Sequence, residues 1–411
     1  MNSALFAPLT LPNGSTLPNR IGKSAMAENM AAQGQLPDER FARLYQRFAD
    51  GGAGLIITGN VMVDANGVST AGDVVLTQNS PIAPFQAWAK AAKSKGAQVW
   101  MQINHPGRQA MAGLGKNTFA PSAIGLELGK HSKLFVTPRA MTEQDILDTI
   151  TRFAETAQAA ERAGFDGVQI HAAHGYLISQ FLSPLSNQRT DRWGGSIENR
   201  ARFLLETIAA VRAAVSPAFS VAVKINSADF QRGGFDESDA LAVVEMLNGT
   251  AVDLVELSGG SYESPALFSG EAKDNRTLAR EAYFLEFAAQ IAKVAQMPLM
   301  TTGGIRRLAV AEAVLEEGIA VAGIATALAL NPNLPNEWKN GNAIVGKAIN
   351  LSFKDKTLRG LAQLILTQRH LHRLGKGEPA GAALNPIWTL VSGQIRDKYL
   401  AMRYKKWVDS Q

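Results

Sequence analysis

Eight short apolar segments alternate along the chain with longer segments of helical periodicity, and this alternation restricts the folds that the sequence can adopt. The expected strands are residues 21–26, 54–58, 98–104, 167–171, 220–226, 253–257, 298–303 and 319–326. The expected helices are residues 38–50, 81–95, 142–163, 197–215, 237–248, 280–295 and 308–317. Continuous apolar strands with helices between them indicate a parallel sheet that is buried on both faces. Eight such units predict an α/β fold, the (β/α)8 TIM barrel.

A doubly wound sheet is the competing architecture, and it usually carries a glycine-rich phosphate-binding turn after its first strand. The related run here, Gly51-Gly52-Ala53-Gly54, precedes an expected strand instead of following one. It is therefore no dinucleotide fingerprint. We expect the barrel to occupy residues 1–335 and a C-terminal helical extension to occupy 336–411, with helices near 356–374 and 388–407.

The composition is that of an ordinary soluble globular protein, with 46% hydrophobic and 19% charged residues among 411. The absence of cysteine excludes disulfides, thiolate zinc sites and iron–sulfur clusters. No apolar run is long enough to span a bilayer, and residues 1–20 lack the pattern of a signal peptide. We therefore expect a cytoplasmic protein.

Positive charge gathers near the C-terminus, where residues 350–411 contain 11 Lys and Arg against 4 Asp and Glu. A basic tail can contact nucleic acid or membrane lipid. This tail is also rich in Leu, Ile and Trp, so we expect it to pack on its own protein or on a neighbouring subunit. A small-molecule substrate is then the expected partner, with neither nucleic acid nor membrane, and a homo-oligomer stays open.

The run 171–176, His-Ala-Ala-His-Gly-Tyr, directly follows an apolar segment that is typical of a buried parallel strand. His171, His174 and Tyr176 should therefore emerge together at the carboxyl end of that strand. Two imidazoles can donate hydrogen bonds to one oxygen, and a nearby phenol can supply a proton. This pattern indicates a site for reducing or protonating a carbonyl compound. The long segments 104–138 and 183–196 should lie at the same end of the barrel, where barrel enzymes carry their chemistry.

Polar residues at the ends of other strands are further candidates. The amide of Gln102 suits the edge of a heterocycle, although a buried structural glutamine is an equally good interpretation. Lys224 lies in an otherwise apolar strand, where an ammonium group needs an anion, and a cofactor anion would satisfy it. Gly303 and Gly304, with Ala325-Thr326 after the last strand, form the pair of turns where barrels commonly bind a phosphate.

A zinc site built on the two histidines is an alternative, because imidazole is a good zinc ligand. The pattern lacks the glutamate of the HExxH motif, and the other histidines (His105, His131, His370 and His372) are scattered along the chain. A metal is therefore not expected.

Three longer motifs make the chain similar to the old yellow enzyme family of FMN-dependent ene-reductases. They are the run 102–108, Gln-Ile-Asn-His-Pro-Gly-Arg, the His–His–Tyr run, and the long run 186–203 that begins Ser-Asn-Gln-Arg-Thr-Asp-Arg-Trp-Gly-Gly. Pro18-Asn19-Arg20-Ile21 near the start agrees with them. The resemblance extends from about residue 5 to about residue 332. The His–His form, in place of His–Asn, resembles the bacterial branch of the family.

The resemblance implies a flavoprotein that carries FMN and takes NADH or NADPH as co-substrate. Hydride would pass from the nicotinamide through flavin N5 to the β-carbon of an α,β-unsaturated carbonyl compound. His171 and His174 would bind the carbonyl oxygen, and Tyr176 would protonate the α-carbon. The resemblance also implies the cofactor contacts: Ser24, Ala25, Met26 and Ala27 along the flavin ring, Asn60 and Gln102 at its polar edge, Lys224 near N1, and Gly303, Gly304, Ala325 and Thr326 at the phosphate.

Five residues at four places depart from the family pattern. Ala27 occurs where many relatives have Thr or Cys, Asn29 where some have a substrate-contacting Tyr, and Asn60 where a small residue is usual. Ala325-Thr326 replaces the Gly-Arg that usually binds the phosphate, and Arg306 or Arg307 is the expected substitute.

Other activities stay open at this point. An FMN barrel enzyme could act on another electrophile or in the dehydrogenating direction, the chain could be a metal-dependent barrel hydrolase, or it could be a binding protein without activity. In the tail, Arg396, Arg403, Tyr404 or Trp407 could reach the active site of a neighbouring subunit.

Overall fold

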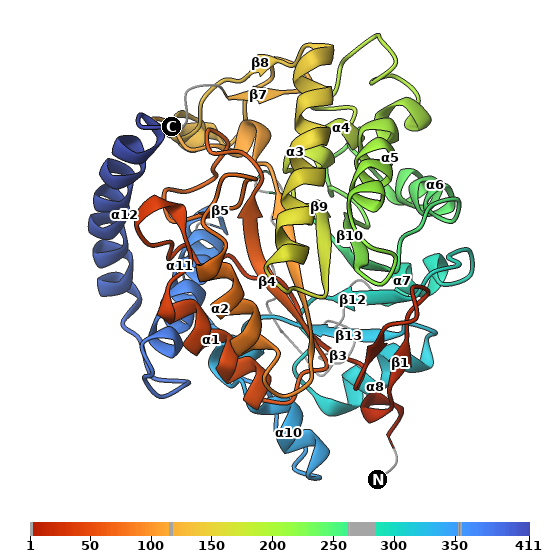
Figure 1. Cartoon of the computed structure of the whole chain (residues 1–411), viewed down its shortest axis with the longest axis vertical. Coiled ribbons are helices and arrows are strands. Elements are labelled where there is room, and N and C mark those ends of the chain that lie inside the picture. The colour runs from red at the N-terminus through yellow and green to blue at the C-terminus, as the bar shows by residue number, and fades with distance from the viewer. Residues whose placement is uncertain (1–2, 115–117, 262, 264–284, 352, 354–355) are drawn as a thin grey trace.

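A computed structural model describes residues 3–114, 118–261, 263, 285–351, 353 and 356–411. Within these residues, eight parallel strands form a closed barrel surrounded by helices (Figure 1). In barrel order they are β3 (Ile21–Lys23), β13 (Val321–Ile324), β12 (Leu299–Thr302), β11 (Leu254–Ser258), β10 (Ser220–Asn226), β9 (Gly167–Ala172), β6 (Gln98–Asn104) and β4 (Leu55–Met62). Pairing of β3 with β4 closes the sheet. The predicted TIM barrel is confirmed.

Each expected strand corresponds to an observed one, but the ends differ at two places that matter for the site. The strand predicted at 21–26 ends at Lys23, and residues 24–27 lie in the loop that follows it. The strand predicted at 54–58 instead continues to Met62 and pairs there with the short β5 (Val74–Val75). Both changes occur at the carboxyl ends of the strands.

Helices follow the strands as predicted, and polar side chains start several of them. The helices of the barrel are α1 (Glu39–Asp50), α2 (Ala83–Ala92), α3 (Glu143–Arg162), α4 (Leu177–Leu182), α5 (Ile197–Ala214), α6 (Glu237–Leu247), α7 (Leu285–Ile291), α8 (Leu308–Glu316), α9 (Thr326–Leu330) and α10 (Leu334–Lys339). Thr142 and Asp145 form a capping box that fixes the start of α3. Residues 280–284 of the helix predicted at 280–295 lie outside the described residues.

A hairpin that the sequence pattern did not predict covers the amino end of the barrel. Its strands are β1 (Leu9–Thr10) and β2 (Thr16–Leu17). Leu11 and Leu17 pack against interior residues of the barrel such as Leu55 and Trp100. Because this end is filled with apolar side chains, polar chemistry is confined to the carboxyl end.

The two long segments at the carboxyl end are joined to each other. The first contains the 3₁₀ helices η3 (Gly107–Gln109) and η4 (Gly129–Leu134) and the strands β7 (Phe119–Ala120) and β8 (Arg139–Ala140). Arg189, from the second segment, donates hydrogen bonds to the carbonyl oxygens of Pro121 and Met141 at 3.0 and 2.6 Å. The long run that carries the family resemblance therefore includes a residue that ties these loops together.

Two long helices follow the barrel, α11 (Lys356–Gly375) and α12 (Pro386–Val408). Helix α11 packs against α1, and α12 packs against α11 and the 3₁₀ turn η2 (Gln33–Gln35) (Figure 1). Buried Leu400, Tyr404 and Val408 of α12 form a cluster with Met62 and Val75. The tail thus packs on its own barrel. Among the described residues, no helix is both long and apolar enough to cross a membrane.

Candidate active site

His171, His174 and Tyr176 lie together at the carboxyl end of β9, as the sequence predicts. The ring centroids of His171 and His174 are 5.1 Å apart, and those of His171 and Tyr176 are 4.8 Å apart. His174 has φ of 60°, a left-handed conformation that is strained for a residue other than glycine. Its N–H donates to Oδ1 of Asn226, and its carbonyl oxygen accepts from Nε2 of Gln109. These two contacts stabilise the strained turn that brings the second imidazole beside the first.

Both imidazoles are electrically neutral. Burial lowers the pKa of His171 and of His174 well below the ordinary value, and the positive charge of Lys224 lowers both further. In His171, Nδ1 accepts a hydrogen bond from the N–H of Ala173 at 3.2 Å. A neutral ring carries one proton, so that of His171 is on Nε2, which is a hydrogen-bond donor. His171 therefore offers a neutral N–H donor to an oxygen atom, beside the second neutral imidazole of His174.

The interior of the barrel beside the histidines contains a polar chain that runs across four strands. Gln102 of β6 donates from Nε2 to Oε1 of Gln169 in β9, at 2.8 Å. Gln169 in turn donates from Nε2 to Oε2 of Glu256 in β11, at 2.7 Å. Lys224 of β10 donates from Nζ to Oε1 of Glu256, at 2.9 Å. The sequence interpretation gave Lys224 a cofactor anion as its partner and overlooked Glu256, which lies in an apolar strand.

Residues 24–29 form the loop after β3. Ser24 is buried and donates from its hydroxyl group to Oγ1 of Thr302, at 3.1 Å, which ties this loop to β12. Ala25, Met26 and Ala27 are partly exposed, whereas the residues on both sides of them are buried. This exposure at the carboxyl end of the barrel agrees with a loop that lines a cofactor site.

The two turns expected at the phosphate are neighbours, because β12 pairs with β13. Gly303 and Gly304 have φ of 136° and 76°, conformations that favour glycine. Gly304 is exposed, and Ala325 and Thr326 are partly exposed. Arg306 lies two residues beyond Gly304, and its carbonyl oxygen accepts from the N–H of Gly346 at 2.7 Å.

Asn60, expected with Gln102 at the polar edge of a flavin ring, has an amide NH₂ group without a hydrogen-bond partner among the described residues. This group tests whether a heterocyclic cofactor fits the site. Asn60 in β4 pairs in register with Gln102 in β6. The buried Nδ2 of Asn60 has no hydrogen-bond partner among the described residues. A buried donor without a partner costs about 1–3 kcal/mol. A ring with carbonyl oxygens and N–H groups matches these two neighbouring amides, so the residues fit a flavin.

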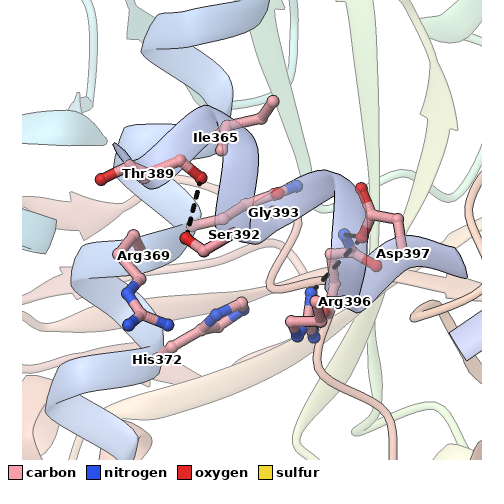
Figure 2. A pocket seen from close by; sticks show the side chains of 10 residues that line it. Ile365, Arg369, His372, Thr389, Ser392, Gly393, Arg396 and Asp397 are labelled. Carbon is pink, nitrogen blue, oxygen red and sulfur yellow. Dashed lines mark hydrogen bonds and ion pairs between the residues drawn. The ribbon is translucent and has the colours of Figure 1, made fainter. Parts of the chain in front are cut away.

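Two of the tail residues expected to reach another subunit contact loops of their own chain. Arg396 of α12 donates to the carbonyl oxygen of Asn29, and Tyr404 donates from its hydroxyl group to the carbonyl oxygen of Ala65, at 2.8 Å. Figure 2 shows Arg396 on α12 and Arg369 and His372 on α11 around one small cavity. The ring of Trp407 lies beside Tyr404, and the guanidinium group of Arg403 lies over the ring of Tyr399.

No group of three or more His, Asp or Glu side chains that could hold a metal ion occurs among the described residues. Nε2 of His174 instead lies 2.8 Å from the hydroxyl oxygen of Ser258.

Comparison with known protein families shows which family the chain belongs to. The model of the NADH:flavin oxidoreductase / NADH oxidase family matches residues 4–344. The chain belongs to this family. Its members are FMN-dependent oxidoreductases that use NADH or NADPH, so the chain is an oxidoreductase with FMN as its cofactor.

Relatives within the family come from fungi and bacteria. The chain is 40% identical over 351 residues to an NADH-dependent flavin oxidoreductase, iliE, of Hypocrea jecorina. The aligned region covers 80% of this chain and 87% of the relative. A second iliE protein, from Neonectria, is also 40% identical, but the chain spans only 46% of its length. An NADPH dehydrogenase of Bacillus subtilis is 34% identical over 78% of this chain and 89% of the relative. The predicted bacterial branch is not confirmed by this mixture.

Solved structures of old yellow enzyme type share the fold. A homologue from Zymomonas mobilis has a TM-score of 0.72 at 24% identity, over 87% of this chain and 98% of that one. A morphinone reductase variant in complex with tetrahydroNAD has a TM-score of 0.69 at 25% identity, over 84% and 92% of the two chains.

Proposed function

We propose that this flavin oxidoreductase is an ene-reductase that reduces the C=C bond of α,β-unsaturated carbonyl compounds. When bound, FMN takes a hydride from NADH or NADPH and delivers it to the second substrate. The observation that carries the proposal is the cluster of His171, His174 and Tyr176, in which two neutral imidazoles lie next to a phenol.

The two histidines have the properties needed to bind a carbonyl oxygen. His171 presents Nε2–H, and His174 is the second donor. As hydride reaches the β-carbon, negative charge develops on this oxygen, and donors that are already in place stabilise it by roughly 3–4 kcal/mol each in comparable sites. Their depressed pKa values keep both rings neutral, so they polarise the carbonyl group without transferring a proton to the oxygen.

Tyr176 completes the reaction by giving its phenolic proton to the α-carbon. It is 8% exposed and lies at the start of α4, beside His171. The hydride brings one hydrogen with two electrons to the β-carbon, and the proton adds the second hydrogen at the α-carbon. The phenolate of Tyr176 then takes a proton from solvent, so the reaction balances. A positioned acid of this kind accelerates proton transfer by about 10²–10⁴-fold.

The remaining predicted site residues are assigned to the cofactor. Ala25, Met26 and Ala27 would line the flavin ring next to Ser24, and Asn60 and Gln102 would meet its polar edge. Lys224 would lie near N1. Gly303, Gly304, Ala325 and Thr326 would hold the phosphate, with Arg306 or Arg307 supplying the charge. The partly exposed loops and the unpartnered amide of Asn60 support these assignments.

An isotope experiment with 2-cyclohexenone tests the proposal. The enzyme with NADH that carries deuterium at the transferred C4 position should yield cyclohexanone labelled at the β-carbon. Unlabelled NADH in D₂O should place deuterium at the α-carbon. His171→Ala should lower kcat/KM for the enone while reduction of the flavin by NADH continues. Failure to form cyclohexanone, although NADH reduces the flavin, would refute the ene-reductase activity for this class of substrate.

A further inference from the structure

Glu256 is buried inside the barrel and joins two sets of residues that have been assigned to the cofactor. Its exposed fraction is 0%, and that of Lys224 is 3%. One carboxylate oxygen accepts from Nζ of Lys224 at 2.9 Å, and the other accepts from Nε2 of Gln169 at 2.7 Å. Through Gln169 the carboxylate is connected to Gln102. A carboxylate in this position can therefore offset the charge of an ammonium group and fix the orientation of an amide.

The chemistry of the carboxylate fixes the direction of the two amides. An ionised carboxylate only accepts hydrogen bonds, so Gln169 must turn its NH₂ group toward Glu256. The carbonyl oxygen of Gln169 is then left for Gln102, which must donate its own NH₂ group. As a result, Gln102 presents its carbonyl oxygen and its second N–H to a ligand. This order of donors and acceptors depends on the negative charge of Glu256.

The same carboxylate offsets the charge of Lys224. Lys224 and Glu256 are in register on neighbouring strands, and His171 is in register with Lys224 on the other side. The ammonium group thus lies in the middle of the site, between an anion and the neutral histidine pair. A lone ammonium group here would favour negative charge on the bound cofactor, and a carboxylate within hydrogen-bonding distance weakens this effect.

We propose that Glu256 is a positioning residue that lowers the redox potential of the bound flavin. It does so by partly neutralising Lys224, and it orients Gln102 through Gln169. The inference rests on the proposed placement of Lys224 and Gln102 beside the flavin ring. The reduced flavin carries more negative charge than the oxidised flavin, so any residue that attenuates the positive charge of Lys224 disfavours reduction.

The test is the midpoint potential of FMN bound to the full-length enzyme, measured by equilibration with reference dyes. Glu256→Gln should raise the potential, because the charge of Lys224 is no longer offset. Lys224→Gln should lower it, because the carboxylate remains alone. The double variant should lie between the two single variants. A potential that is unchanged or lowered in Glu256→Gln would overturn the inference.

Control variants separate the possible reasons for failure. Asp253→Asn removes a carboxylate that is paired with Arg212 just before β11, and it should leave the potential unchanged. Gln169→Met breaks the amide chain but keeps the ion pair, so it should weaken FMN binding, measured by flavin fluorescence, with a smaller shift in potential. If Glu256→Gln does not fold, Glu256→Asp replaces it, because the shorter side chain draws the carboxylate away from Lys224. Glu256→Asp should then raise the potential, and an unchanged potential in this variant would overturn the inference.

The outcomes also distinguish this inference from the proposed function. If Lys224→Gln and Glu256→Gln both leave the potential unchanged, Lys224 does not lie beside the flavin, and the proposed cofactor placement fails. If only Lys224→Gln changes it, the placement stands and the role of Glu256 is refuted. Neither result depends on turnover of an enone.

Discussion

The Nε2 atom of His174 and the hydroxyl oxygen of Ser258 lie 2.8 Å apart, which connects the loop after β9 to the end of β11. The hydroxyl group can either donate to the ring or accept from it. When Ser258 donates, the ring proton of His174 is on Nδ1, and when Ser258 accepts, the proton is on Nε2. Only when Ser258 donates does His174 keep an N–H, on Nδ1, for a substrate oxygen, so Ser258 controls whether the second imidazole can act as a donor.

Ser258→Ala should lower kcat/KM for an enone by about 2- to 10-fold, because a hydrogen bond of this kind contributes about 0.5–1.5 kcal/mol. Reduction of the flavin by NADH should not change. Combination with His174→Ala should add almost nothing to the effect of His174→Ala. Ser227→Ala is the matched control, since its buried hydroxyl group has no hydrogen-bond partner among the described residues. Additive effects of Ser258→Ala and His174→Ala would contradict the coupling.

Tyr176→Phe removes the proposed proton donor and keeps the ring that packs beside His171. Reoxidation of the reduced enzyme by 2-cyclohexenone should become about 10²–10⁴-fold slower, as expected when a positioned acid is lost. Stopped-flow absorbance under anaerobic conditions measures this step apart from reduction by NADH. Reoxidation at the wild-type rate would assign the proton to another group or to water.

Arg306→Ala and Arg307→Ala test how the phosphate is bound without the usual arginine. The residue that contacts the phosphate should, when replaced, weaken FMN binding by about 10- to 150-fold, which corresponds to a charge-assisted contact of about 1.5–3 kcal/mol. The amount of FMN that each variant retains after dialysis, and then its Kd for FMN, shows which arginine contacts the phosphate. Full retention by both variants would show that neither arginine compensates.

The stability of the protein should fall as the pH is lowered, and His372 should contribute to this loss. Burial, with Arg396 next in effect, lowers the pKa of His372 to about 3, and its Nε2–H donates to the carbonyl oxygen of Glu28 at 2.7 Å. Between the unfolded pKa of about 6.5 and the folded value, only the unfolded chain binds the proton. The free energy of unfolding therefore falls on acidification through this window, by up to about 1.4 kcal/mol per pH unit from this group.

His372→Gln keeps a donor for the Glu28 carbonyl oxygen but removes the titration. Urea unfolding between pH 7 and pH 5 should then show a shallower dependence on pH than in the wild type. Some dependence should remain, because His171 and His174 also have lowered pKa values. Identical slopes for the two proteins would contradict the assignment to His372.

The barrel and the histidine cluster could be predicted because their signals are local. Apolar runs mark the strands, and His171, His174 and Tyr176 follow one of them within six residues. Glu256 was overlooked although, like Lys224, it is a charged residue in an apolar strand, because the sequence does not show that the two strands are neighbours. Its importance depends on a register with Lys224 that only the folded sheet reveals.

Contacts between distant segments could not be predicted in the same way. Arg396 and Asn29 are 367 residues apart in the chain, and no local pattern pairs them. The hairpin of β1 and β2 was missed because strands of two residues are too short to show periodicity. In both cases the deciding information is tertiary packing.

The visible absorption spectrum of the purified protein, recorded during anaerobic addition of NADH and then of 2-cyclohexenone, tests the cofactor and the reaction together. The flavin bands should bleach with NADH and return with the enone, and the Tyr176→Phe variant should bleach normally but recover slowly. A protein that bleaches with NADH but does not recover with the enone would contradict the proposed reaction. A protein that stays colourless when FMN is supplied would contradict the cofactor site itself.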